Sequence, residues 1–459
     1  MELTSNAGCF SSFSFRNLLP RLAKPTQVPA TEAKVPNVID GSIDDKIRPL
    51  DTGVVKTVES KLDELDPQLR ELSLEIHSHP ELGFHEEYAH DVLTAFLEKH
   101  NFEVTRHYAG LKTAWRAEFS VGYGGRVLGV NSEMDALPGI GHACGHNLIA
   151  MSGVGIAVAV KTALVKHGIP GKVVILGTPA EEGGGGKIIL LQEGAYKDMD
   201  ICIMSHPAPG ETYSAADGST NAAQTMFVEY TGKPAHAAGS PWEGINALDA
   251  AVSAYNSISS LRQQLKPDLR VHGIIEGSNW APNVIPDNAR LTYIARASNK
   301  RDLVDLVERL KRCFHAAALA TGCGVNIEMN RAYLDLRQNP VLAREFGITI
   351  MNRYGMTANH LSSSASTDFG NVTYELPGFH PVYAIPTEPN GGNHTPKFTH
   401  AARTKEAHAA AIKVTKGLAL TGLRVLSDEL FFEEVKAAFE ADKEARLLGK
   451  PDNGMFFGN

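Results

Sequence analysis

The chain has 459 residues, of which 43% are hydrophobic and 21% charged, and its formal net charge is −8 at pH 7. A chain of this length exceeds what one hydrophobic core usually supports, so we expect two domains. The acidic balance argues against a general nucleic-acid-binding protein, because binding of phosphates requires a basic surface. We therefore expect a partner that is a small molecule or another protein.

The first segment, residues 1–53, is rich in Ser, Pro and Thr, and we expect a disordered N-terminal extension there. Residues 9–25 are weakly amphipathic and contain Arg and Ser, which leaves a transit peptide as the alternative. Glu2, the early prolines and the lack of a clear cleavage region favour a cytosolic extension. We accordingly expect a cytoplasmic protein.

Residues 54–220 predict the first part of an α/β domain. Apolar side chains recur at helical spacing from Val54 to His100 and predict two amphipathic helices, joined at 77–87. Strands and helices then alternate, as in an α/β sheet whose functional loops lie at the strand ends. The expected strands lie within 103–109, 113–119, 125–138 and 171–187, and the expected helix lies at 147–166.

The most apolar long stretch, residues 151–165, raises the question of a membrane span. It is interrupted by Lys161 and is shorter than the roughly 20 residues that a membrane span needs. We interpret it as a buried helix and expect no membrane partner.

The pattern changes after about Gly218. Residues 221–330 predict the order strand, helix, strand, strand, helix, strand, which is a complete ferredoxin-like unit. We place this inserted domain at 221–332. The α/β pattern resumes over 333–427 and completes the first domain, and a charged helix and a tail follow over 428–459. The expected fold class is therefore α/β, with a sheet domain interrupted by a ferredoxin-like (β-α-β-β-α-β) insertion.

Four segments offer side chains that bind divalent metal ions, each at or just after a predicted strand. They are "HACGHN" at 142–147, "TPAEEGGGGK" at 178–187, "MSHPAPG" at 204–210 and "GGNHTPKF" at 391–398. An α/β sheet gathers its working groups at the strand ends, so we expect these segments to meet. Two ions that share several such ligands form a tight site and lower the pKa of bound water. The candidate ligands are Cys144, His146, Glu181, Glu182, His206 and His394.

The adjacent residues Glu181 and Glu182 indicate two different roles, metal binding and proton transfer. Adjacent loop residues point in different directions, so one carboxylate can bind a metal while its neighbour takes a proton from water. The glycines that follow allow the backbone to approach metal or substrate closely. The segment is not a phosphate-binding loop, because its glycines are contiguous and Lys187 is followed by Ile188.

Each of these residues has a more ordinary explanation when it is considered alone. A lone Cys144 is more often a buried, inert thiol, and His142 and His146 would more often be loop or helix-cap histidines. The agreement of all four segments favours the metal site. A redox role for Cys144 is disfavoured, because the cysteines are scattered and include no C-x-x-C pair. The other cysteines are Cys9, Cys202, Cys313 and Cys323.

Further segments share in a family resemblance: "GKPAHAAGSPWEGINALDA" at 232–250, "PNVIPDNARLTYIAR" at 282–296 and "STDFGNV" at 366–372. Together with the four segments above, they resemble the two-metal amidohydrolases of metallopeptidase family twenty. That family includes aminoacylase, hippurate and auxin-conjugate hydrolases, and aminobenzoyl-glutamate hydrolase. The chain most resembles its Xaa-Arg (β-alanyl-lysine) dipeptidase branch, from about Leu69 to Leu423.

The resemblance implies a role for each candidate ligand. Cys144 would bridge two divalent metal ions, with zinc favoured and manganese or cobalt as alternatives. Glu181 would be the general base and later the proton donor to the leaving amine. Asp135 would orient a ligand from behind, and Asn147, often Asp in the hydrolase relatives, favours the dipeptidase branch. The remaining implied ligands are His146, Glu182, His206 and His394.

The resemblance also implies functional residues in the inserted domain, which would act as a lid or dimerisation domain. His236 would stabilise the oxyanion, often across a dimer, with a helix cap as its ordinary alternative. Asn283 and Arg296 are candidates for binding a substrate carboxylate, because the planar guanidinium suits that group. For Arg296 the ordinary alternative is a surface residue on a strand.

The predicted function is metal-assisted hydrolysis of an amide that joins an acyl or aminoacyl group to an amino acid, as in a dipeptide. One alternative is that the same site forms amides or acts on a specialised metabolite. Another is a non-catalytic metal-binding scaffold, against which stands the presence of every ligand and of Glu181. A homodimer through the inserted domain is expected from the family alone.

Overall fold

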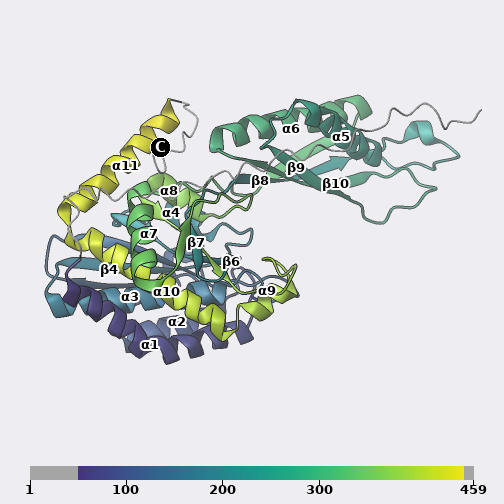
Figure 1. Cartoon of the computed structure of the whole chain (residues 1–459). Helices are drawn as coiled ribbons and strands as arrows, with labels where there is room; N and C mark the ends of the chain where they lie inside the picture. The colour runs from purple at the N-terminus through teal and green to yellow at the C-terminus, as the bar shows by residue number, and fades with distance from the viewer. Residues whose placement is uncertain (1–49, 449–459) are drawn as a thin grey trace, which may run out of the picture. The chain divides into compact units, whose positions relative to one another are not determined.

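The computed structural model describes residues 50–448. The predicted N-terminal extension lies outside the described residues except for 50–53, and so do Cys9 and the tail after Leu448. The helices are α1 (Thr52–Ser78), α2 (Glu87–Lys99), α3 (His146–His167), α4 (Gly186–Gln192), α5 (Ala247–Leu261), α6 (Lys300–Thr321), α7 (Pro340–Tyr354), α8 (Phe369–Glu375), α9 (Pro396–Ala401), α10 (Lys405–Ser427) and α11 (Glu429–Leu447) (Figure 1). The strands are β1 (Glu103–Arg106), β2 (Trp115–Val121), β3 (Arg126–Glu133), β4 (Gly171–Thr178), β5 (Ile201–Ile203), β6 (His206–Pro209), β7 (Ser214–Ala216), β8 (Ala222–Thr231), β9 (Arg270–Glu276), β10 (Asn288–Ala297), β11 (Gly324–Met329), β12 (Thr357–Asn359), β13 (Gly378–Phe379) and β14 (Val382–Ile385).

A six-stranded sheet with the order β1-β2-β4-β3-β5-β13 forms the centre of the α/β domain. Strands β4, β3, β5 and β13 run parallel to one another, whereas β2 is antiparallel to both of its neighbours, β1 and β4. Strand β13 follows the inserted domain in the sequence and pairs with β5. The residues after the insertion therefore complete this sheet, and the exact domain boundaries stay predictions.

Helices cover both faces of this sheet, which explains why its strands are apolar without interruption. On β4, Val173 and Ile175 lie in the core that includes α1, α3 and α10. The alternate residues Val174 and Leu176 lie in the core that includes α4 and α8. Because successive side chains of a strand point to opposite faces, one strand serves both cores. The expected α/β class is confirmed.

Helix α1 shows how the sequence pattern produces this packing. The side chain of Asp51 accepts hydrogen bonds from the N–H groups of Gly53 and Val54 and so caps the helix. A stripe of apolar side chains at helical spacing is then buried against α3 and α10. The stripe consists of Leu62, Leu65, Leu69, Leu72 and Ile76.

Helix α3 is buried, as expected, but the length argument against a membrane span was wrong. The helix has 22 residues and is the one described helix that is long and apolar enough to cross a membrane. Of its most apolar window, 83% is buried inside the fold, where the helix packs against α1, α10 and β3. A core helix passes the same test of length and composition, so burial explains its apolar character.

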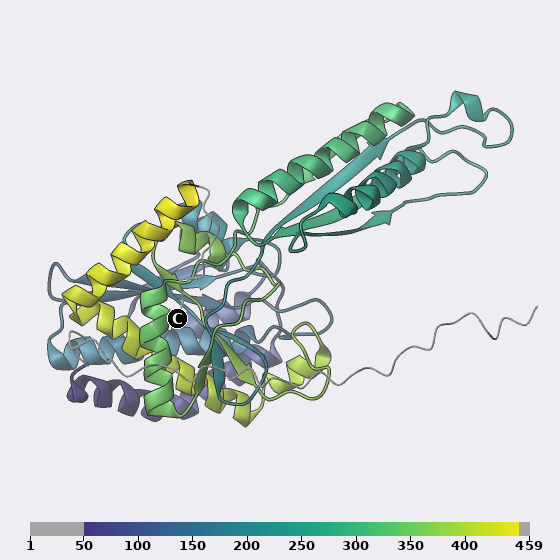
Figure 2. The same cartoon turned by 45° about the horizontal axis from the view of Figure 1, so that its top comes forward.

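The inserted domain has the predicted order β8-α5-β9-β10-α6-β11. Its four strands form an antiparallel sheet with the order β11-β8-β10-β9. Alternate residues of β8 are buried, and they form a separate core with α5 and α6. The expected ferredoxin-like insertion is confirmed, and Figure 2 shows its two helices on one side of its sheet.

Two features differ from the sequence-based expectations. A second four-stranded sheet, β12-β7-β14-β6, joins short strands before and after the insertion, and strands of three or four residues carry too little pattern to be predicted. In the segment expected to complete the α/β domain, a short helix that was not expected, α9, precedes the long helix α10, with a break at 402–404. The break follows from capping, because the Thr404 hydroxyl accepts the N–H of Ala407 and starts α10.

Candidate metal centre

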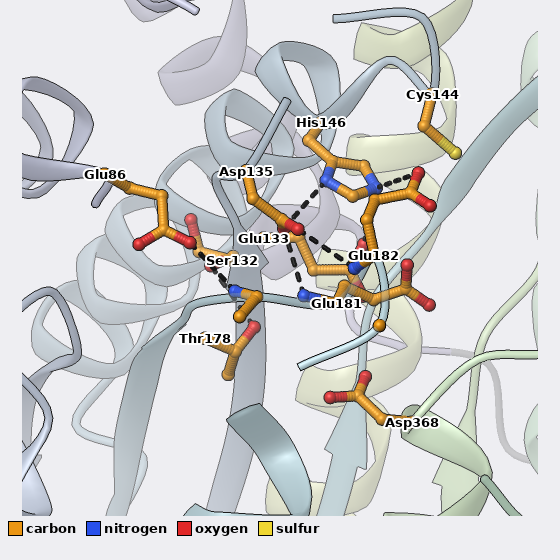
Figure 3. A network of polar contacts seen from close by, with 12 residues as sticks. Glu86, Ser132, Glu133, Asp135, Cys144, His146, Thr178, Glu181, Glu182 and Asp368 are labelled. Atoms are coloured by element: carbon orange, nitrogen blue, oxygen red, sulfur yellow. Dashed lines mark hydrogen bonds and ion pairs between the residues drawn. The ribbon is translucent and has the colours of Figure 1, made fainter. Parts of the chain in front are cut away.

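The four predicted ligand segments meet at one edge of the six-stranded sheet. Strands β3, β4 and β5 are parallel, so their carboxyl ends share this edge, where functional groups of open α/β sheets gather. Figure 3 shows Cys144, His146, Glu181 and Glu182 converging there. The four segments therefore lie close together in the structure, as expected from the sequence.

Two of the four groups of possible ligand atoms in the described residues share Cys144. The atoms of Cys144, His146 and His206 lie within 4.8 Å of one another, and so do those of Cys144, Glu182 and His394. A thiol, imidazoles and a carboxylate are the donors that suit zinc and similar divalent ions. The geometry thus offers two adjacent cation sites with one common sulfur atom.

The two histidines of the first group are held as metal-binding histidines usually are, with one ring nitrogen fixed and the other free to bind. The Nδ1–H of His146 donates to Asp135 Oδ1 at 3.2 Å. Its Nε2 is buried and has no hydrogen-bond partner within residues 50–448, and it lies 3.4 Å from Glu133 Oε2. The Nδ1–H of His206 donates to the carbonyl oxygen of Pro207 at 2.8 Å, while its Nε2 lies 3.3 Å from Cys144 Sγ. These nitrogens fit a bound cation.

The loop that carries His394 is fastened to the loop that carries Cys144. The backbone N–H of His394 donates to the carbonyl oxygen of Ala143 at 2.9 Å, and its Nε2 lies 3.2 Å from Glu182 Oε1. His394 has φ of 66°, a left-handed conformation that is unusual outside glycine. The hydrogen bond to Glu182 raises the pKa of His394, while burial and the nearby charge of Arg296 oppose that effect.

Gly145 allows Cys144 and His146 to lie at the start of α3. It has φ of 78°, and a Cβ atom there would lie 2.5 Å from Pro207 Cγ. A side chain at this position would therefore push His206 and its strand away from Cys144. The glycine is required by both its backbone conformation and this close approach.

The backbone before and around Glu181 is held by buried carboxylates. Asp135 accepts the N–H groups of Glu181 at 3.1 Å and Glu182 at 2.9 Å, as Figure 3 shows. Glu86 accepts the N–H of Ala180 at 2.8 Å. Asp135 thus holds both the imidazole of His146 and the loop of Glu181, which fits the orienting role that the resemblance implies for it.

The two neighbouring glutamates have opposite electrostatic environments. Burial raises the pKa of Glu181 well above its usual value, and the nearby carboxylates of Glu133 and Glu182 add to this effect. Burial also acts on Glu182, but its hydrogen bond to His394 and the charge of His146 hold its pKa below the usual range. Such a separation is what assigns one carboxyl group to proton transfer and the other to an anionic role.

A buried ion-pair cluster lies beside Glu181 and was not foreseen. Lys187 is fully buried, and its Nζ lies 2.7 Å from Glu133 Oε1 and 2.5 Å from Asp368 Oδ1. Burial opposes ionisation of Glu133, but Lys187 and His146 lower its pKa to about 2. Burial raises the pKa of Asp368 to about 6 against the attraction of Lys187.

Several of the residues that support the site were therefore missed from the sequence. Lys187 was considered only as part of a phosphate loop, although a lysine after a glycine run at a strand end was a visible signal. The others were identified only by burial and contact between distant segments, although Asp368 lies in the segment "STDFGNV" that shares in the family resemblance. These are Glu86, Glu133, Tyr333 and Asp368.

The predicted residues of the inserted domain lie at its two ends. Arg296 is at the end of β10 where its Nη1 donates to Ser366 Oγ at 2.8 Å, and its charge acts on His394. His236 is exposed and lies next to Asn283, whose carbonyl oxygen accepts the N–H of Ala237 at 3.0 Å. The ten residues of β10 separate these ends by about 30 Å. Within one chain, Arg296 therefore lies at the end of the inserted domain that faces His394, and His236 and Asn283 lie at the other end.

His142 has a structural environment. Its Nε2–H donates to the carbonyl oxygen of Ile76 at 3.1 Å, and the side chain is buried. Burial lowers the pKa of His142 to about 3, so the ring is neutral. It connects the end of α1 with the Cys144 loop and belongs to neither group of ligand atoms.

Comparisons with known proteins agree with this geometry. Residues 219–322 match the family model for the M20 peptidase dimerisation domain. The chain is 41% identical to the mouse Xaa-Arg dipeptidase and 42% identical to the human Xaa-Arg dipeptidase. These matches cover 84% and 83% of this chain, and 93% and 90% of the relatives. A crystal structure of a dinuclear metal-binding peptidase of the M20 family from Bacillus subtilis superposes with a TM-score of 0.62 at 20% identity, over 79% of this chain and 99% of that one.

Proposed function

Because this chain belongs to the M20 peptidase family, a family of metallo-amidohydrolases, we propose that it is a dipeptidase that cleaves dipeptides with a basic C-terminal residue. The observation that carries the proposal is the convergence of two cation sites on Cys144 beside a glutamate with a raised pKa. The high identity to Xaa-Arg dipeptidases over most of both chains supports the substrate class. The related N-acyl amino acids form the alternative substrates.

We propose that two divalent ions would be held here with Cys144 as a shared ligand, and zinc is favoured over manganese and cobalt. His146 and His206 would complete one site, and Glu182 and His394 the other. The structural similarity to the dinuclear metal-binding peptidase from Bacillus subtilis supports this stoichiometry. When bound, two such ions polarise an amide carbonyl and make water more acidic.

The chain's own residues supply the remaining chemistry. Glu181 takes the proton of the attacking water and later donates it to the leaving amine, for which a carboxyl group of raised pKa is suited. Asp135 holds His146 and the backbone of Glu181 in place. Arg296, at the end of the inserted domain that lies towards His394, binds the substrate carboxylate.

His236 and Asn283 would act from a second copy of the chain. They lie together at the exposed end of the inserted domain, about 30 Å along β10 from Arg296. The match to a dimerisation domain supports a homodimer, in which this end could reach the partner's metal centre. There His236 would stabilise the oxyanion, and Asn283 would help to bind the substrate carboxylate. We retain a cytoplasmic location as a prediction.

The first experiment is a hydrolysis screen of the metal-loaded protein. β-Alanyl-lysine and aminoacyl-arginine dipeptides are compared with N-acyl aromatic and aliphatic amino acids. The proposal requires the highest kcat/KM for the basic dipeptides, loss of activity on chelation and its return with zinc, manganese or cobalt. Two bound metal equivalents without cleavage of any amide would instead favour the non-catalytic scaffold.

The second experiment tests the general base. Glu181→Gln should retain two metals but lower kcat by roughly 10²–10⁴-fold, the usual contribution of general acid–base catalysis. Glu193→Gln is the matched control, because Glu193 is exposed at the end of α4. Near-normal turnover by Glu181→Gln would refute the assignment.

A further inference from the structure

The hydroxyl of Tyr333 holds the backbone of the loop that carries Glu181. It donates a hydrogen bond to the carbonyl oxygen of Glu181 at 2.6 Å and accepts the N–H groups of Gly183 at 3.2 Å and Gly185 at 2.9 Å. These bonds use both the proton and the accepting capacity of the phenol. Tyr333 is buried, and burial raises its pKa, so the hydroxyl keeps its proton at working pH.

This loop depends on side chains for its shape. Ala180, Gly183 and Gly185 have φ of 56°, 108° and 68°, so the chain turns through left-handed conformations between β4 and α4. Glu86 and Asp135 hold the N–H groups of its first half, up to Glu182. The hydroxyl of Tyr333 holds its second half and the carbonyl of Glu181.

Tyr333 itself lies where the chain leaves the inserted domain. Its backbone pairs in both directions with Ala223 of β8, with N···O distances of 2.9 and 2.8 Å. Strand β8 is the first strand of the inserted domain, so the two connections of this domain run side by side at Tyr333. The phenol thus reaches from this junction to the catalytic loop.

The α/β domain holds the same junction from the other side. Asn371 of α8 accepts the N–H of Leu334 at 3.0 Å and donates to the carbonyl oxygen of Ala332 at 3.1 Å. One side chain therefore clamps both neighbours of Tyr333. Through it, the position of the phenol is tied to α8 as well as to β8.

We propose that Tyr333 is a positioning residue that couples the junction of the two domains to the general base, so that a displacement of this junction moves the backbone of Glu181. The inference rests on the proposed function in assigning Glu181 that role. Closure of domains around substrate often completes a catalytic site, and a misplacement of about 1 Å can cost roughly 10²-fold in rate. The hydrogen bond from the Tyr333 hydroxyl to the carbonyl oxygen of Glu181 connects the junction directly with the residue that it would position.

The first test is Tyr333→Phe, which keeps the ring and removes the three hydrogen bonds. With β-alanyl-lysine as substrate, kcat should fall about 10–100-fold while KM changes less than about two-fold and two metals remain bound. Amide hydrogen exchange of residues 180–187 in the metal-loaded protein without substrate should become faster. A normal kcat, or a loss of rate explained by loss of metal, would overturn the proposal.

Tyr374→Phe is the matched control. The hydroxyl of Tyr374 donates to Asp335 Oδ1 at 2.6 Å, on the same linker as Tyr333, but it does not touch the loop of Glu181. This variant should leave kcat and the exchange of 180–187 unchanged. An equal loss of kcat in both variants would show a general effect on the linker and contradict a specific role for Tyr333.

Asn371→Ala tests the coupling, because it releases the linker and leaves the hydroxyl of Tyr333 in place. We expect faster exchange at 180–187 and a kcat lowered by about 3–10-fold. Unchanged exchange would show that the junction is not coupled to the loop. Exchange needs no substrate, so a protein without dipeptidase activity would refute the proposed function while the exchange still tests the coupling.

Discussion

The metal-ligand edge of the sheet and the far end of the inserted domain differ in how firmly other side chains of the same chain hold their predicted functional residues. At the sheet edge, the buried side chains of Asp135 and Glu86 hold the candidate ligand His146 and the backbone of Ala180 and Glu181. At the far end, His236 is exposed, and its Nδ1 accepts only backbone N–H groups of its own turn, from Ala238 and Gly239. The difference teaches that a single chain holds the candidate metal ligands and Glu181 in place, whereas the proposed oxyanion role of His236 would require a second copy.

The largest effect should come from the residue that both cation sites share. Cys144→Ala removes a ligand from each site, so metal content and activity should both fall, with a loss of rate at least as large as the roughly 10²–10⁴-fold expected without the general base. Cys202→Ala is the control, since Cys202 is also buried, in β5, but belongs to neither group. Two retained metals in Cys144→Ala, measured by elemental analysis, would contradict a shared ligand.

His236 tests the other side of the comparison. His236→Ala should lower kcat by roughly 10²–10³-fold, the usual cost of losing one oxyanion donor. His272→Ala on β9 of the same domain serves as the control and should retain activity. When inactive His236→Ala and Glu181→Gln chains are mixed and allowed to exchange, activity should return, because one site of each heterodimer then has both groups. No recovery in proven heterodimers would mean that His236 does not act across the dimer.

Acidic pH should lower the free energy of unfolding, because His380 is buried beside the metal-ligand edge of the sheet. Neither of its ring nitrogens has a hydrogen-bond partner within the described chain. Burial lowers the pKa of His380 to about 3, whereas an unfolded histidine has pKa of about 6.5. The unfolded state therefore binds more protons between these values, so the contribution to stability is complete above pH 6.5 and declines as the pH falls towards 3.

The measurement is urea unfolding of the metal-free protein at pH 7.5 and 5.0. Over this interval the titration of His380 should cost about 2 kcal/mol, which His380→Phe should abolish while keeping an aromatic ring beside Phe369. His315→Gln is the control, because His315 is exposed on α6. An equal loss of unfolding free energy in wild type and His380→Phe would exclude this histidine as the source.

The smallest effect concerns the substrate carboxylate. Arg296→Lys keeps the charge but loses the planar fork, so KM should rise about 10-fold with a smaller change in kcat. Arg290→Lys, at an exposed position of the same strand, should leave both constants unchanged. An unchanged KM in Arg296→Lys would place carboxylate binding elsewhere.

Much of the fold followed from local pattern. The leucine stripe of α1, the apolar strands and the β-α-β-β-α-β order each reflect a period or an order that neighbouring residues carry. The sheet of β6, β7, β12 and β14 could not be predicted, because its strands are short and come from both sides of the insertion. The membrane argument failed for a related reason, since the length of α3 is set by where its ends are capped and not by its apolar stretch alone.

The sequence by itself indicated the candidate ligand residues and their chemistry, because thiol, imidazole and carboxylate groups that follow predicted strands can be recognised from the residue types alone. Only the tertiary structure decided that Cys144 is common to two groups of ligand atoms, that Lys187 is a buried counter-ion, and that Tyr333 reaches the loop of Glu181. These properties depend on distance and burial between segments far apart in the chain. Local sequence patterns do not encode such distances.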